Sequence, residues 1–420
     1  APDTGTQYYG LFDAESKYSY DSGNGYFYRD AGGAWDGNWL NWLTLRKVDL
    51  AKKVMMGGQA LDARNGDGTQ ILIGEVTTDR NWEWQFDSTN VSPYSGTNYF
   101  GMYNGYIYVD NDSYPYADYY AAYRIRVLKE EAFEPEAFVD GNAAGVLQRI
   151  GDKARWGYAS FDGDDGANIH YPVGSDTATI AEYLQGEAMN SWTPLAESLY
   201  VTLQYFKQEA VAGGLGLDSD ATGPLNDTWD PYNDNGEVVW CAKSFVILLT
   251  DGASTQDLHI PSSLKNLTDG HDTFITGATT FGSDGSDYLK DVAHYMRTND
   301  LRTDIEGEQN ASLYTVYMFD DDANARDLLK ESARQGGFDD RNDNGWPDGL
   351  KSDSPVDRKE WDDNEDGDPD TYYEAHDGFV LEAQLISAIN DILARAASGT
   401  AASVLATNAE GEGNLVQAYF

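Results

Sequence analysis

The chain contains little cysteine, few basic residues and no long apolar run. One cysteine, Cys241, excludes an internal disulfide framework and a cysteine-built zinc site, and its place just before an apolar run predicts a buried thiol. The chain has 28 Lys and Arg residues but 71 Asp and Glu residues. The resulting net charge of -43 argues against nucleic acid or anionic membranes as partners. No stretch approaches the roughly 18 apolar residues of a membrane span. We expect a globular chain whose natural partners are cations.

Aromatic residues are plentiful. The 420 residues include 29 Tyr, 15 Phe and 11 Trp, which is too many aromatics for a disordered acidic chain. Ten of the tyrosines fall between Tyr94 and Tyr123, among Gly, Asn, Asp and Ser. This composition is typical of binding loops, because tyrosine gives contact area at low entropic cost. Hairpin faces that pack on the domain explain the same block equally well.

The residues from Ser244 to Gly252 predict the centre of the fold. Five consecutive apolar residues run into Thr250, Asp251 and Gly252. A strand that is apolar on both faces indicates a parallel sheet covered by helices on both sides, and such sheets bind ligands beyond the carboxyl ends of their strands. Asp251 is therefore a candidate binding residue, although a simple turn after the strand is an equally good interpretation.

Helical and strand patterns alternate around this stretch. Helical periodicity begins at Asp36 and stops at Gly57, and Thr193 is expected to cap another helix. Alternating strands and helices predict an α/β fold with a doubly wound, mostly parallel sheet. The other expected elements are a hairpin (155–161 and 168–173), helices near 289–296, 323–335 and 378–397, and strands at 312–319 and 414–420.

These patterns divide the chain into six parts. They are a Tyr-rich segment with the first helix (1–58), a Tyr-rich insertion with β pieces (59–153), an α/β core (154–336), an acidic loop region (337–377), the last core helix (378–400) and a C-terminal tail with a strand-like end (401–420).

One acidic pattern occurs twice, 22 residues apart. Oxygen-bearing side chains at positions 1, 3, 5 and 9, with Gly at position 6, are what a loop needs to wrap a hard cation such as calcium. Neither copy has Glu at position 12, so these are not EF-hands and must take further ligands from elsewhere, with Glu360 and Glu374 as candidates. Solvated acidic turns remain the alternative. The predicted metal-binding residues are Asp340, Asn342, Asn344, Trp346 and Asp348 in the first copy, and Asp362, Asn364, Asp366, Asp368 and Asp370 in the second.

Sequence motifs of enzymes are missing. The chain contains no GxxxxGK[ST], HExxH or GxSxG, and its five histidines show no ligand spacing. We therefore expect a protein that is not an enzyme. A hydrolase with a pair of carboxylates stays open as an alternative, because acidic pairs abound in this composition.

Several stretches resemble a known family. These are YYGLFD (8–13), NWLNWLTLRKVDLAKKV (38–54), SWTPLAESLY (191–200), WCAKSFVILLTDG (240–252), the twin acidic loops and the tail GNLVQAYF. Together they resemble the von Willebrand factor A-type region of the PilY/PilC family of type IV pilus tip and biogenesis adhesins.

The resemblance implies a second metal site. In A-type domains a divalent cation, magnesium for example, is held by a D-x-S-x-S loop, a Thr and an Asp, and Thr193 and Asp251 match the last two positions. No D-x-S-x-S occurs in this sequence. The site is therefore expected to be incomplete, and the first strand that carries the serine loop is expected upstream of Tyr8.

The interpretation that follows is an extracellular or cell-surface adhesion module of a pilus-associated protein, stabilised by calcium. Its partners would be pilus or filament subunits, or the severed N-terminal part of the same precursor. Without the first strand, the sheet is expected to have an open slot beside Ser244–Thr250. A subunit of a filament built by strand exchange, with residues 414–420 as the donor strand, and a secreted hydrolase are the alternatives.

Overall fold

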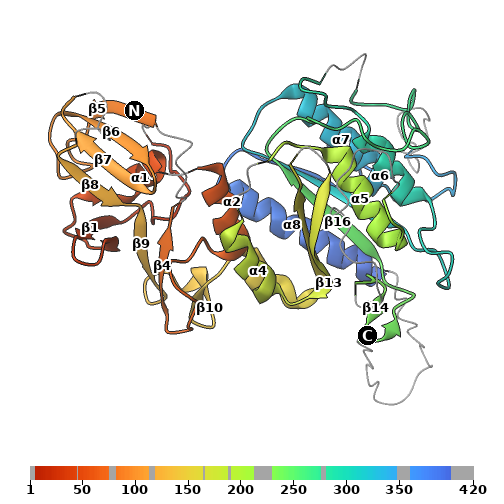
Figure 1. Cartoon of the computed structure of the whole chain (residues 1–420), viewed down its shortest axis with the longest axis horizontal. Helices are drawn as coiled ribbons and strands as arrows, with labels where there is room; N and C mark the ends of the chain where they lie inside the picture. The colour runs from red at the N-terminus through yellow and green to blue at the C-terminus, as the bar shows by residue number, and fades with distance from the viewer. Residues whose placement is uncertain are drawn as a thin grey trace, which may run out of the picture.

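The computed structural model describes residues 5–44, 46–74, 82–112, 119–163, 166–187, 191–211, 229–275, 281–347 and 360–398. Figure 1 shows two lobes, an aromatic β lobe formed by the first part of the chain and an α/β lobe formed by the rest. Strands predicted after residue 398 lie outside the described residues.

The β lobe contains two sheets. The first has the order β3-β1-β2-β9-β4 and the second the order β5-β6-β7-β8. Their inward faces share one aromatic core in which Phe27, Trp39 and Phe100 are almost completely buried. The strands are β1 (Lys17–Asp21), β2 (Tyr26–Arg29), β3 (Trp35–Asp36), β4 (Thr69–Ile73), β5 (Trp82–Asp87), β6 (Thr97–Tyr103), β7 (Tyr106–Asp110), β8 (Ala121–Arg124) and β9 (Arg126–Glu130).

The expected long helix after Asp36 is two helices. α1 (Gly37–Thr44) packs into the β lobe, and α2 (Lys47–Met56) begins after Arg46, whose φ of -118° and ψ of 160° are extended. An extended residue interrupts the hydrogen bonds of a helix, so the prediction of one continuous helix was wrong. Gly57 ends α2 in the left-handed conformation, as predicted.

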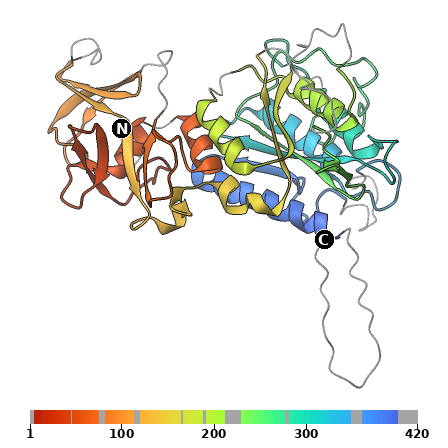
Figure 2. The same ribbon diagram turned by 60° about the horizontal axis from the view of Figure 1, so that its bottom comes forward.

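Short elements join the lobes. They are β10 (Phe138–Val139), β11 (Asn142–Ala143), α3 (Val146–Ile150), α4 (Thr177–Gly186), and 3-10 turns at Pro135–Ala137 and Gly151–Lys153. Figure 2 shows α2 at the junction, beside the start of α8 (Gly378–Ser398). Val54 of α2 packs with Leu381 and Leu385 of α8. The predicted hairpin is present as β12 (Trp156–Phe161) and β13 (Ala167–Ser175), which pair antiparallel.

Three parallel strands form the centre of the α/β lobe. β16 (Ser244–Thr250), β17 (Ala311–Met318) and β18 (Tyr372–Ala375) pair in that order. Leu313 and Tyr317 of β17 face α6 and α7, whereas Tyr314 and Val316 face α8. Because helices cover both faces, both sets of side chains are apolar, which explains the unbroken apolar run that the sequence showed.

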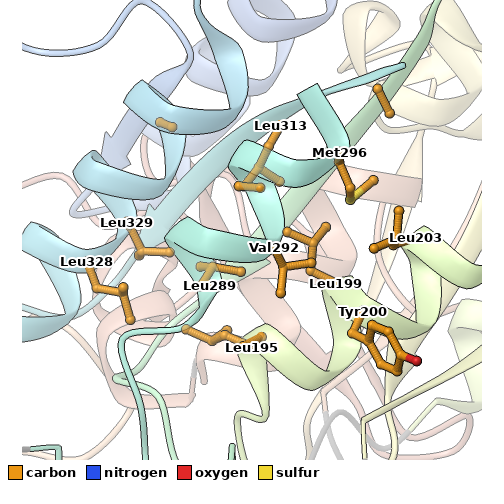
Figure 3. Packing of buried hydrophobic residues seen from close by; sticks show 14 of the residues in the cluster. Leu195, Leu199, Tyr200, Leu203, Leu289, Val292, Met296, Leu313, Leu328 and Leu329 are labelled. Atoms are coloured by element: carbon orange, nitrogen blue, oxygen red, sulfur yellow. The ribbon is translucent and has the colours of Figure 1, made fainter. Parts of the chain in front are cut away.

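Helices α5 (Leu195–Lys207), α6 (Leu289–Thr298) and α7 (Ala323–Gly337) cover one face of this sheet. Figure 3 shows their core, a cluster that includes Leu199 of α5, Val292 of α6, Leu329 of α7 and Leu313 of β17. The helices predicted around 195, 289, 323 and 378 are therefore confirmed in place.

The prediction of a mostly parallel sheet was wrong for the chain as a whole. The other described sheets are antiparallel except for one parallel pairing of β2 with β9, and they include the small hairpin of β14 (Asn233–Asp234) and β15 (Glu237–Val238). Local hydrophobic patterns do not specify strand direction, and the acidic and Tyr-rich segments form hairpins of their own.

In the described part of the chain, β16 lies at one edge of the parallel sheet, and the β12–β13 hairpin is a separate sheet. Six of the seven residues of β16 are only partly buried, although five of the seven are apolar. Residues 8–12 do not occupy this edge, because Asn38 and Asn41 of α1 hold their backbone.

The single cysteine lies at the surface. Cys241 is exposed in a turn between β15 and β16, so the predicted buried thiol was wrong: the turn precedes the strand and stays outside the core. Among the helices that the structure describes, none combines the length and the apolar character needed to cross a bilayer.

Candidate metal sites

The two acidic loops after α7 have the same internal hydrogen bonds. In the first, Asp340 accepts the N–H groups of Asn344 and Gly345, at 3.1 and 2.8 Å. In the second, Asp362 accepts those of Asp366 and Gly367, both at 3.1 Å. The side chains at positions 3 and 5 also accept N–H groups at matching places. The repeated spacing therefore produces a repeated conformation.

The backbone dihedral angles repeat as well. Position 4 is left-handed in both loops, with φ of 57° at Asp343 and 58° at Glu365. Position 6 has φ of 76° at Gly345 and 94° at Gly367, where a side chain would be strained. In each loop the N–H of position 5 lies within hydrogen-bond distance of oxygens from positions 1 and 3, so these two side chains lie close together, as a cation-binding loop requires.

Neighbouring residues fix the loops to each other and to the α/β lobe. Arg341 of the first loop lies 3.1 Å from the carboxylate of Asp363 in the second. Lys330 of α7 lies 2.6 Å from Asp368, and the ring of Trp346 stacks on His271 at a centroid distance of 3.9 Å. The side chains at position 7 therefore contact the α/β lobe, Trp346 through His271 and Asp368 through Lys330.

Among the residues that the structure describes, no three His, Cys, Asp or Glu side chains are grouped closely enough to hold a metal ion as they stand. Asp348, at position 9 of the first loop, lies outside the described residues. Of the two additional candidates, Glu360 is buried beside the first loop and accepts the N–H of Arg341 at 3.1 Å. Glu374 instead accepts hydrogen bonds from two guanidinium nitrogens of Arg326 and from the hydroxyl group of Tyr372.

Electrostatics in the second loop favour a cation. Burial raises the pKa of the carboxyl groups of Asp362 and Asp370, and a neighbouring carboxylate adds to each shift, from Asp366 in one case and Asp363 in the other. Raised values mean that the negative charges are costly where they lie. A bound divalent cation would remove this cost, so the donors present fit calcium chemically.

The rim of the parallel sheet holds the second predicted site. Asp251 follows β16, and its carboxylate lies 3.3 Å from the ammonium of Lys47, the first residue of α2. Asp320, after β17, lies 3.8 Å from the same ammonium. Together with Asp321 and His376, Asp320 lines a shallow hollow at this rim. A side-chain cation thus already stands between the two carboxylates.

Thr193 lies at the same rim, where its hydrogen-bond partners are Ala253 and Thr255. Its hydroxyl donates to the carbonyl of Ala253, and its N–H donates to the Thr255 hydroxyl at 2.9 Å. The two predicted residues are therefore brought to one rim, where each has a different partner.

The prediction that Thr193 caps α5 was wrong. Asp257, from the loop after β16, accepts the N–H groups of Ala196 and Glu197 at 3.0 and 2.9 Å. Ser254 and Ser286 also donate to this buried carboxylate. Burial raises the pKa of Asp257 to about 7 against the opposing effect of these bonds. Asp257 and Lys47 could not be identified from the sequence, because their partners lie far away along the chain.

Comparison with known proteins gives one match. Residues 3–117 match the family model described as "PilY1 homolog, small alpha/beta domain". The N-terminal part of this chain is related to the PilY1 homologues. The match covers the segments at 8–13 and 38–54 that carried the resemblance, and the central strand and twin loops lie beyond it. No curated protein and no solved structure matches the chain.

Proposed function

We propose that this chain is a calcium-stabilised binding module of a type IV pilus-associated protein, displayed at the cell surface. The observation that carries the proposal is the PilY1-homologue match over residues 3–117. The twin loops support the calcium part, because two copies share their spacing, their left-handed residues and their hydrogen bonds. A von Willebrand A-like architecture for the α/β lobe is supported by parallel strands with helices on both faces.

The test is a binding assay with purified type IV pili. The chain is expected to be retained on immobilised pili in millimolar calcium and less in EGTA. The variant Asp340→Ala/Asp362→Ala should behave in calcium as the wild type does in EGTA. Absence of retention under both conditions would contradict the pilus assignment, and equal retention would contradict the calcium part. We propose no catalytic role, and turnover of glycan or peptide substrates by the purified chain would favour the hydrolase alternative.

A second candidate function is assembly by strand exchange, and the edge position of β16 favours it. In the described part of the chain one edge of β16 is unpaired, and such an edge with partly buried apolar side chains is a template for an added strand. The end of α8 lies beside the start of this edge, since the Lys243 ammonium donates to the Arg395 carbonyl at 2.7 Å. A chain leaving α8 there could enter a neighbouring molecule as a parallel strand.

Deletion of residues 414–420 tests this second candidate. Strand exchange predicts filaments for the full chain and loss of filaments for the truncated chain, as seen by electron microscopy and light scattering. Unchanged assembly would rule out the tail as the donor. A stable complex of two polypeptides that does not grow would contradict assembly into filaments.

A further inference from the structure

Tyrosines line the outer face of the sheet formed by β5 to β8. The strand register places Tyr103 opposite Tyr106, and Gly101 opposite Tyr108. Directly paired residues of antiparallel strands share a face. The residues between them point the other way and are buried in the aromatic core: Phe100, Met102, Ile107 and Val109. The tyrosine face is therefore opposite the aromatic core, and Tyr103, Tyr106 and Tyr108 are partly exposed on it among the described residues.

The rings on this face form a row. Tyr108 lies in the middle, with ring centroids 5.8 Å from Tyr106 and 4.7 Å from Tyr119. The interplanar angles of 35° and 58° leave the rings tilted against one another instead of closed into a sandwich. Tyr119 is 49% exposed.

Small residues keep the ring of Tyr108 accessible. Its two cross-strand neighbours are Gly101 and Ala122, which do not rise above the sheet. Partial burial raises the pKa of Tyr108, and the nearby phenols of Tyr119, Tyr106 and Tyr103 add to the shift. The hydroxyl group of Tyr108 therefore stays protonated at neutral pH and can both donate and accept hydrogen bonds.

Charge narrows the class of ligand. A chain with a net charge of -43 repels nucleic acids and other polyanions. A quaternary ammonium ligand needs rings around one point, whereas these rings form a row, and the Arg124 guanidinium already lies 5.3 Å from the Tyr106 ring. A neutral ligand with repeating flat faces fits better.

We propose that Tyr106, Tyr108 and Tyr119 form a stacking platform for a neutral hexopyranose glycan. The C–H groups on one face of a pyranose ring carry partial positive charge and pack on the negative face of an aromatic ring. Its hydroxyl groups can bond to the phenols and to Arg124. Successive sugar units would cover successive rings. This inference rests on the proposed binding function and names the chemistry of its ligand.

The experiment measures binding of the full chain to immobilised cellohexaose, maltohexaose, chitohexaose and mannohexaose. At least one should bind, and Tyr108→Ala and Tyr119→Ala should each weaken that binding by about tenfold or more. Tyr108→Phe keeps the ring and should retain most of the affinity. The matched control is Tyr28→Ala, which removes an exposed tyrosine from a strand of the other sheet.

The outcomes are separable. Failure of the wild type to bind any of the four glycans overturns the platform, and so does binding that survives both alanine variants. If the glycan does not inhibit binding of the chain to immobilised pili, the tyrosine platform is not the site that binds pili. The proposal that the chain binds pili is not affected by this result. Glycan binding without retention on pili supports the platform and contradicts the pilus assignment.

Discussion

The twin loops and the sheet rim were both predicted to bind cations, and they differ in how they hold their charge. Each loop holds its oxygens through hydrogen bonds within nine residues, and the carboxyl groups of Asp362 and Asp370 have raised pKa values. At the rim, Asp251 and Asp320 share the ammonium of Lys47, which comes from about 200 residues away or more. The rim carboxylates share one lysine, whereas in the loops Lys330 and Arg341 pair with Asp368 and Asp363 and burial leaves the charges of Asp362 and Asp370 costly.

This difference shows why acidic residues alone do not define a metal site. A cation binds where negative charge is costly and oxygens are already oriented. The second loop meets the first condition at Asp362 and Asp370, and both loops hold the carboxylate of position 1 in matching hydrogen bonds. At the rim the lysine has replaced the ion, so a divalent cation would first have to displace it.

The largest expected effect concerns calcium and the loops. A ligand bound only to the folded state at one hundred times its Kd contributes about 2.7 kcal/mol per site, so two sites give about 5 kcal/mol. Asp340→Ala/Asp362→Ala should remove most of the calcium-dependent rise in Tm, measured by calorimetry. The matched control, Asp343→Asn/Glu365→Gln, changes charge at position 4 of each loop and should keep the rise. A wild-type Tm that is equal in calcium and in EGTA would contradict the calcium sites.

A middle-sized effect is expected at Asp257, which holds the loop after β16 on α5. Asp257→Asn places an amide against N–H donors and should lower the free energy of unfolding by about 2 kcal/mol, because buried donors lose their acceptor. The cost should depend on pH. The pKa of Asp257 in the folded protein, about 7, exceeds the usual value of an unfolded chain. Protonation of Asp257 therefore stabilises the folded state; this contribution is complete below about pH 4 and is lost as the pH rises through about 7.

Denaturant unfolding between pH 4 and 8 measures this dependence. The wild type and the variant should differ most near pH 4 and least near pH 8. Asp284→Asn, an exposed change in the same loop region, should leave the free energy of unfolding within about 0.5 kcal/mol of wild type. A constant difference across the pH range would show that Asp257 does not titrate with folding.

The smallest effect is expected at the rim. Asp251 and Lys47 are each 46% exposed, and exposed ion pairs contribute about 0–1 kcal/mol. Lys47→Ala should therefore lower stability by less than about 1 kcal/mol. It should also open the rim to ions, so that millimolar magnesium stabilises the variant but not the wild type. Lys17→Ala, which removes another exposed ion pair, is the control. An equal magnesium response in wild type and variant would show that Lys47 does not compete with the ion.

Much of the fold could be predicted from local pattern. The apolar run at Ser244–Thr250, the hairpin near 156–175 and the helix stripes were visible because burial on two faces or on one face leaves a period in the sequence. The interruption at Arg46 and the direction of most strands could not be read in this way. Both depend on packing between segments that are distant along the chain.

The sequence determined the twin loops, because their spacing, glycines and acceptor side chains act over nine residues and need no distant partner. Tertiary structure decided the rest of the candidate chemistry. It set Lys47 between Asp251 and Asp320, gave the cap of α5 to Asp257 instead of Thr193, and aligned Tyr106, Tyr108 and Tyr119 on one face. Those side chains meet only because strands and helices pack in one arrangement, and no short-range spacing encodes which residue will lie opposite another.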